Sequence, residues 1–236
     1  MEKVFYDLHM HSCLSPCADD DMTPANMAGM ARLKGLDIAA LTDHNSCRNC
    51  LPFVNRCKEN GILALAGMEI NTEEEIHAVC LFEDPDNAMA FDQFVYERLP
   101  AYRNDPEIYG HQYVVDENDN IVDEIEKLLI SACDISIMDL KSIVSEFHGV
   151  CFPAHIDKPS YSILAVLGFL PPECGFSSAE ISRFPLIDKT LTEHPELEGM
   201  NLFTDSDAHY LWDISERCHY KELHEKSLRA LLKTIG

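Results

Sequence analysis

Val4-Phe5-Tyr6-Asp7-Leu8-His9-Met10-His11 is the stretch that decides the fold of this chain. Aromatic, β-branched and other apolar residues dominate it, which predicts a buried strand. Residues two positions apart in a strand point to the same side. His9 and His11, at the end of this strand, can therefore aim two imidazoles at one point. On their own they are compatible with a metal site or with an exposed N-terminal pair.

Strands, loops and helices alternate after this first strand. Thr23-Pro24 and Gly35 are typical of the start and the end of a helix. We expect the following elements: helix 24–34, strand 37–41, helix 50–59, strands 62–66 and 76–82, helix 86–99, a hairpin over 113–122, helix 138–147, strand 150–155, helix 161–167, strands 178–182 and 201–204, and a C-terminal helix over 221–233. Such alternation favours parallel strands, and 236 residues suit one α/β barrel. We therefore predict a single domain, 1–236, with residues 86–150 inserted at the barrel rim.

The composition limits the partners that the chain can have. Its 18 Lys and Arg against 41 Asp and Glu give a net charge of −23, which argues against long nucleic acid and anionic membranes. An anionic substrate would also be repelled unless bound cations reversed the charge at the site. No apolar run approaches the ~18 residues of a membrane span. The sequence carries no signal for an oligomeric state.

Ten cysteines are present, and the N-terminus enters a strand at once. We therefore predict a cytoplasmic protein with reduced thiols rather than a disulfide framework. Cys13 with Cys17 and Cys47 with Cys50 are close pairs that leave two interpretations open. They are a separate zinc or iron–sulfur site, or small buried residues that happen to lie close together.

Polar side chains recur where the predicted strands end. They are His9, His11, His44, Glu69, His77, His155, Asp207 and His209, to which we add Asp19 from the first loop. Strand ends at the C-terminal face are where barrel enzymes build their active sites. Imidazole and carboxylate together suit zinc, manganese or iron, and one carboxylate can bridge two ions. The pattern predicts a metal centre on this face.

Several of these segments resemble the motifs of the PHP (polymerase and histidinol phosphatase) superfamily. They are residues 7–12, Thr42-Asp43-His44, Glu69 with His77, Ala154-His155 and residues 206–209. The resemblance implies a distorted (βα)7 TIM-like barrel with up to three divalent ions, Zn, Mn or Fe, at the C-terminal face. It implies three groups of ligands: His9, His11, Glu69 and Asp207; Glu69 again with His77 and His155; and Asp19 with His44 and His209. The family usually has Ser-Asp-Gly in the first loop, whereas this chain has Pro-Cys-Ala-Asp-Asp-Asp, so Asp20 and Asp21 remain alternatives to Asp19.

Three further residues are candidates for catalysis or substrate binding. Arg183 directly follows a predicted strand and Lys158 lies three residues beyond His155, so either can bind a phosphate. Asp43, beside His44, can orient a ligand by accepting a hydrogen bond, or can cap its strand.

Together these features predict a metal-dependent phosphoesterase that hydrolyses a small phosphorylated compound, preferably a phosphomonoester, with metal-activated water. The alternatives are a non-catalytic metal-binding module and a phosphodiesterase or exonuclease that acts on nucleotides or short oligonucleotides. A further alternative is an amidohydrolase-type enzyme on a related barrel, for which no lysine ligand is found at a strand end.

Overall fold

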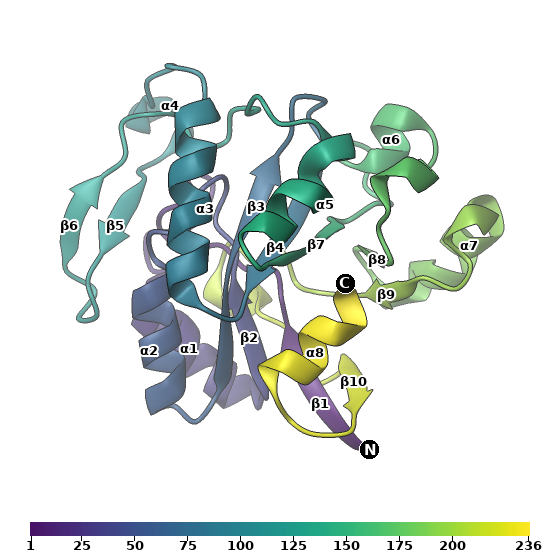
Figure 1. The fold of residues 1–236 in the computed structure, drawn as a ribbon. Helices are drawn as coiled ribbons and strands as arrows, with labels where there is room; N and C mark the ends of the chain where they lie inside the picture. The colour runs from purple at the N-terminus through teal and green to yellow at the C-terminus, as the bar shows by residue number, and fades with distance from the viewer.

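A curled sheet of six strands, in the order β10-β1-β2-β3-β4-β7, forms the centre of the protein (Figure 1). The computed structural model describes residues 1–236. The six strands are β1 (Glu2–Asp7), β2 (Ile38–Leu41), β3 (Leu63–Asn71), β4 (His77–Phe82), β7 (Val150–Pro153) and β10 (Tyr220–Leu223). Two further pairs are the hairpin of β5 (Tyr113–Val115) and β6 (Ile121–Glu124), and the parallel pair of β8 (Ser178–Glu180) and β9 (Asn201–Phe203).

The curl of the sheet brings its two ends toward each other. The segment after β1 meets the segment after β9, where His11 N donates to Ala208 O at 3.0 Å. Beyond β7, Ile156 N donates to Glu180 O of β8 at 2.9 Å. The predicted α/β class is thus confirmed in its coarser form, as a mixed α/β fold with a half-barrel sheet.

The predicted strand directions are only partly right. β1, β2 and β3 run parallel, but β4 is antiparallel to both β3 and β7, because residues 72–76 turn the chain directly back without a helical crossover. The helix predicted over 221–233 is wrong in its first part. Residues 220–223 are the edge strand β10, antiparallel to β1, where Lys3 lies opposite Glu222 and Tyr220 packs on Phe5.

Eight α-helices accompany the strands. They are α1 (Pro24–Lys34), α2 (Cys50–Glu59), α3 (Pro85–Arg98), α4 (Pro106–Tyr109), α5 (Ile137–Glu146), α6 (Ile163–Leu167), α7 (Ile187–Glu193) and α8 (Leu228–Ile235). α3 packs on β3 and β4, and α5 packs on β7. The β5–β6 hairpin, which lies between these two helices in the sequence, is at one side of the molecule (Figure 1). The single domain with a rim insertion remains a prediction. No helix has both the length and the apolar character to cross a bilayer.

Alternate residues of the strands pack into two separate hydrophobic cores. In β2, Ala39 and Leu41 enter a large core with the helices, while Ile38 and Ala40 enter a smaller one. The smaller core collects residues from β1, β2, β3, β4, β7, β9 and β10, so it fills the concave side of the sheet. Leu231 and Ile235 of α8 also belong to it. The C-terminal helix therefore packs against the concave side.

The ten cysteines are all free, and eight of them are buried. The Cys47 and Cys50 thiols lie 3.1 and 3.3 Å from the carbonyl oxygen of Gly67. A side chain at Gly67 would not fit, because its Cβ would lie 2.7 Å from Cys80 O. This pair therefore serves packing around a close approach of strands, and it belongs to no group of potential metal ligands.

Phe203 provides a test of the concave core. Its ring is fully buried, 5.6 Å from the Tyr6 ring and 5.5 Å from the Phe152 ring. We expect Phe203→Ala to lower the free energy of unfolding by about 3–5 kcal/mol, because it leaves a cavity. Phe184→Ala, at a side chain 65% exposed, is the control and should change stability by less than ~0.5 kcal/mol. Equal urea midpoints for the two variants would contradict this assignment of the core.

Candidate metal centre

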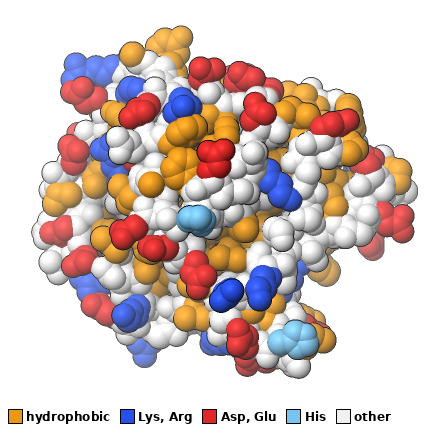
Figure 2. Space-filling view, viewed as in Figure 1, with side chains coloured by type: hydrophobic (Ala, Val, Ile, Leu, Met, Phe, Trp, Pro, Cys, Tyr) orange, Lys and Arg blue, Asp and Glu red, His pale blue; other side chains and the backbone are white.

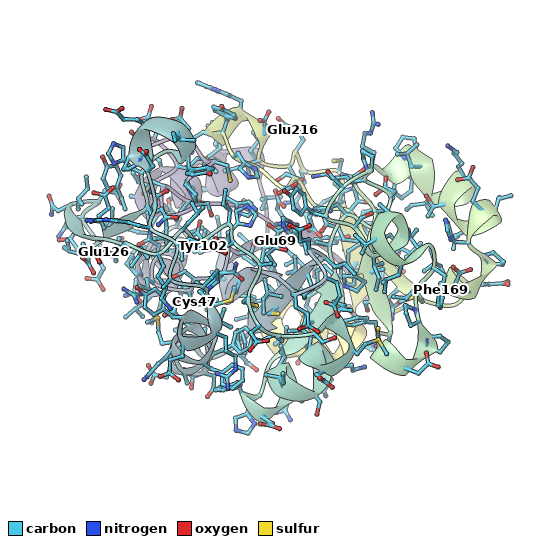
Figure 3. The ribbon with its side chains drawn as sticks, turned by 90° about the horizontal axis from the view of Figure 1, so that it is seen from above. Cys47, Glu69, Tyr102, Glu126, Phe169 and Glu216 are labelled. Atoms are coloured by element: carbon cyan, nitrogen blue, oxygen red, sulfur yellow. The ribbon has the colours of Figure 1, made fainter.

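The Glu69 carboxylate, near the end of β3, lies among five imidazoles. Glu69 is 1% exposed and lies near the middle of the molecule viewed from above, whereas Glu126 and Phe169 lie toward its edges (Figure 3). The nitrogens around its oxygens are His77 Nδ1 at 2.9 Å, His155 Nε2 at 3.0 Å, His9 Nε2 at 3.2 Å, His44 Nδ1 at 2.9 Å and His11 Nε2 at 3.4 Å. Glu69 is thus the geometric centre of the site.

The strand arrangement explains this convergence. β1, β2 and β3 are parallel neighbours, so the residues that follow them meet at one edge of the sheet. His44, just beyond β2, forms a β-bridge with Glu69. The register of β4, with His77 opposite Asn71, places His77 on the same face as Glu69.

The segments that follow β1 and β9 close the site. The bridge between Met10 and Ala208 brings the neighbouring residues Asp207 and His209 to the end of β1. Asp207 Oδ1 lies 3.2 Å from His11 Nε2 and 3.4 Å from His9 Nε2. Asp207 and His155 have positive φ values of 51° and 28°, which is costly for residues with a Cβ. Strained backbone thus places two of the predicted ligands.

Three overlapping groups of side chains have the geometry to hold a metal ion. They are His9, His11, Glu69 and Asp207; His44, Glu69 and His77; and His11, His44 and His209. His155 joins them through Glu69. The structure therefore brings together all of the predicted ligands except Asp19.

The Asp19 carboxylate belongs to none of these groups. Its Oδ1 accepts a hydrogen bond from Asp21 N at 2.9 Å, so it caps the turn of its own loop. The alternatives Asp20 and Asp21 are both exposed and also lie outside the groups.

Hydrogen bonds orient three of the imidazoles. His9 Nδ1 lies 2.8 Å from Glu180 Oε2, His11 Nδ1 lies 3.0 Å from Ser15 Oγ, and His209 Nδ1 lies 2.8 Å from Asp207 O. A carboxylate and a carbonyl only accept, and the Ser15 hydroxyl donates to Asp43, so each Nδ1–H must donate. In the neutral form of each ring the free lone pair is therefore on Nε2, as a metal ligand requires.

Glu180 is the functional residue that the sequence analysis missed. It is fully buried at the end of β8 and also accepts from His155 N at 3.2 Å. The predicted strand 178–182 placed Glu180 in mid-strand, whereas β8 ends at Glu180, so the strand-end criterion that identified Glu69 did not extend to it. Asp43 accepts from Ser12 and Ser15 and contacts no imidazole directly, so it acts on His11 through Ser15.

The charges inside the site balance one another. Burial alone would raise the pKa of Glu69, but His77, His9 and His44 lower it well below its usual value. Burial alone would lower the pKa of His9, but Glu180 and Glu69 raise it well above its usual value. Burial and the neighbouring His209 and His44 lower the pKa of His11 well below its usual value. The cluster thus keeps Glu69 ionised and His11 neutral, the states in which they bind metal.

The unpartnered atoms of the cluster fit a metal centre. His44 Nδ1, His155 Nδ1 and Glu69 Oε2 are buried and make no hydrogen bond. His44 Nδ1 and Glu69 Oε2 face each other at 2.9 Å without the alignment of a hydrogen bond. Buried polar atoms without a partner are rare and costly, and coordination of a cation would satisfy them.

A cavity of about 170 Å³ opens onto the cluster. It is lined by His44, Glu69, His77, His155, Lys158, Ser160, Tyr161, Asp207 and His209. Lys158 Nζ forms an ion pair with Asp207, and Tyr161 stacks on His77 at 4.7 Å. Arg183 is exposed and does not line this cavity. Of the two predicted phosphate ligands, only Lys158 faces the site, and the role of Arg183 remains a prediction.

Parts of this sequence are similar to known proteins. Residues 7–152 match the family model of the PHP domain. An uncharacterized protein of Methanocaldococcus jannaschii is 34% identical over 87 residues, a match that covers 33% of this chain and 51% of that protein. The chain therefore spans about half the length of the curated relative that it matches.

Solved structures agree with the fold at low identity. A lesion-specific endonuclease of Pyrococcus furiosus has a TM-score of 0.68 at 16% identity, and the match covers 98% of this chain and 55% of the endonuclease. An amidohydrolase of Chromobacterium violaceum has a TM-score of 0.63 at 18% identity, and the match covers 99% of this chain and 98% of the amidohydrolase. A protein of Bifidobacterium adolescentis, described as a metal-dependent phosphoesterase, has a TM-score of 0.62 at 17% identity. The match covers 96% of this chain and 95% of that protein.

The resemblance inferred from the sequence is confirmed, because the match to the PHP model extends over more than half of the chain. The match runs from the histidines after β1 through Glu69 and His77 to β7. This chain belongs to the PHP domain family.

Proposed function

We propose that this chain hydrolyses the ester bond of a small phosphorylated compound, with a phosphomonoester as the preferred substrate. The observation that carries the proposal is the buried Glu69 carboxylate, with five imidazoles around it and Asp207 beside them. Two or three divalent cations, Zn, Mn or Fe, held there would activate water and stabilise negative charge on a phosphoryl group.

We divide the ligands into the three groups that the family resemblance implies. His9, His11, Glu69 and Asp207 would hold the first cation, and Glu69, His77 and His155 would hold the second. Glu69 would serve both, because its carboxylate lies within 3.4 Å of ligand nitrogens from both groups. His44 and His209 would hold a third cation, for which the resemblance implies Asp19 as the carboxylate.

Lys158 is our candidate for binding the phosphate. Its pKa is raised, because Asp207 and Glu180 outweigh the effect of burial, so the ammonium group is retained at the cavity. It supplies a positive side-chain charge in a protein whose net charge is −23. Tyr161, beside His77, bounds the space left for the leaving group.

The size and charge of the site favour a small substrate. A cavity of about 170 Å³ accommodates a phosphate with a compact leaving group. Acidic side chains are spread over the face in Figure 2, with Lys and Arg between them and no continuous basic stripe. A long polyanion would therefore find few phosphate contacts on this face.

We further propose that β8 and β9 complete a distorted seven-stranded barrel. The bridge between Met10 and Ala208 supports this proposal.

Metal content and turnover test the proposed function together. We expect two to three divalent ions per chain in protein purified without added metal, and hydrolysis of phosphomonoesters. The same sample should be tested on phosphodiesters, on amides and on a duplex oligonucleotide with an abasic site, since structural neighbours include an endonuclease complex with such a duplex and an amidohydrolase. If only one of these other substrates were cleaved, that class would take the place of the phosphomonoester in the proposal. Failure to bind metal after reconstitution would refute the proposal.

His77 tests the ligand groups. We expect His77→Ala to lower the metal content by one ion per chain and turnover by at least roughly 100-fold, with an unchanged circular dichroism spectrum. His111→Ala is the matched control, since His111 lies outside the ligand groups and pairs with Glu124. Unchanged metal content in His77→Ala would show that His77 binds no ion.

Lys158 tests phosphate binding. We expect Lys158→Ala to raise KM and the inhibition constant of free phosphate by roughly 10–100-fold, as for loss of one charge-assisted hydrogen bond, with metal content unchanged. Arg183→Ala is the companion variant, because the sequence also predicts Arg183 as a phosphate ligand. A larger effect of Arg183→Ala would transfer the role to Arg183, and unchanged KM in both variants would exclude both.

A further inference from the structure

A second cavity shares no lining residue with the cavity at the metal centre. Its volume is about 520 Å³. Tyr6 of β1, Tyr220 and Lys221 of β10, and residues of β9 and of the segment that leads into α7 line it. The proposed function gives this cavity no role.

The cavity occupies an opening between two sheet edges. β10 is the last strand of the six-stranded sheet, and β9 is paired only with β8. These two edge strands do not pair with each other. Instead, Lys221 Nζ of β10 donates to Leu202 O of β9 at 2.9 Å. A side chain thus spans the opening that a backbone ladder would otherwise close, and it covers an unpaired edge carbonyl.

The charge in this cavity is opposite to that of the whole protein. The net charge of the chain is −23, yet Lys221 and His219 line the cavity and no Asp or Glu does. Lys158 and Lys226 pair with carboxylates, whereas Lys221 contacts only Leu202 O and the Phe203 ring, at 4.0 Å from its centre. Burial lowers the pKa of both Lys221 and His219, because it removes water from their charged forms. An anion in the cavity would replace that water.

The other walls are mainly apolar, with one hydroxyl among them. The exposed Phe184 ring lies 6.4 Å from the His219 ring, so two flat groups border the cavity. Thr204 is only 4% exposed, and its Oγ1 is buried without a hydrogen-bond partner. Such a hydroxyl is rare and costly, and a ligand in the cavity would satisfy it. Thr204 follows Leu202 by two positions, so their side chains lie on the same side of the chain.

We propose that this cavity binds a small carboxylic acid with a flat aromatic body. Lys221 and Thr204 would bind the carboxylate, while Phe184, His219 and Leu202 would enclose the ring. Apolar walls with a few polar groups, around several hundred Å³, are the usual form of a small-molecule site. One ammonium group and one hydroxyl match the single charge of a carboxylate better than the double charge of a phosphomonoester.

Calorimetric titration of the full chain with 2-naphthoate tests the recognition of charge. We expect uncharged 2-naphthylmethanol to bind at least roughly 10-fold more weakly, because it cannot pair with Lys221. Lys221→Met should raise the Kd of 2-naphthoate by roughly 10–100-fold, and Thr204→Val by roughly 3–10-fold. Lys233→Met is the matched control, since Lys233 is exposed on α8 and outside the cavity. Equal binding of the acid and the alcohol, or equal Kd values for Lys221→Met and Lys233→Met, would overturn the inference.

Alkylation locates the ligand without any variant. Cys218 is exposed and lines the cavity, and Cys17 is the other exposed cysteine. At about ten times its Kd, 2-naphthoate should slow the reaction of Cys218 with iodoacetamide by roughly 10-fold and leave that of Cys17 unchanged. Inorganic phosphate, which the proposed function directs to the metal centre, should not protect Cys218. Cys218 that stays reactive at saturating 2-naphthoate would refute this site. Neither measurement uses turnover, so the inference is tested apart from the proposed function.

Discussion

The contact between one buried carboxylate, Glu69, and the imidazoles around it is the constraint on which the rest of the site depends. An isolated carboxylate at this depth would cost several kcal/mol in lost solvation. Here the histidines compensate that cost, and in return Glu69 fixes the direction in which their nitrogens point. Their ligand atoms must be deprotonated to bind a cation, so occupancy of the site falls as the pH falls. Glu69 therefore connects the stability of the apo cluster with its capacity for metal.

A second layer of acids supports this centre from behind. Glu180 holds His9, and Asp43 holds the first loop through Ser12 and Ser15. Asp205 accepts from Leu8 N at 2.6 Å, while Asp7 accepts from Ser206 N at 3.1 Å. These last two bonds are reciprocal, since each joins the first strand to the segment after β9. Most of these buried acidic side chains thus order the backbone rather than a substrate.

Much of this arrangement was predictable from the sequence, because strand ends and their histidines follow simple periodic patterns. His9, His11, Glu69 and His77 were identified in this way. The metal ligand in the first loop could not be predicted, because the turn of the loop decides which of several neighbouring side chains faces the site. The Asp19 carboxylate instead caps the loop. Glu180 was missed because its strand was predicted to continue to residue 182, which placed Glu180 in the middle of the strand. β10 was mistaken for helix because its strand character comes from pairing with β1, not from its own charged residues.

The reciprocal bonds between β1 and the segment after β9 have a consequence for the order of folding. Leu8 and Asp205 are 197 positions apart, and Asp7 and Ser206 are 199 apart. Closing so long a loop is slow, because its entropic cost precedes any gain from the contacts. His9, His11 and Glu69 emerge early in synthesis, yet Asp207 and His209 come from the final segments of this sequence. A nascent chain therefore holds most of its ligands well before Asp207 arrives and the site can close.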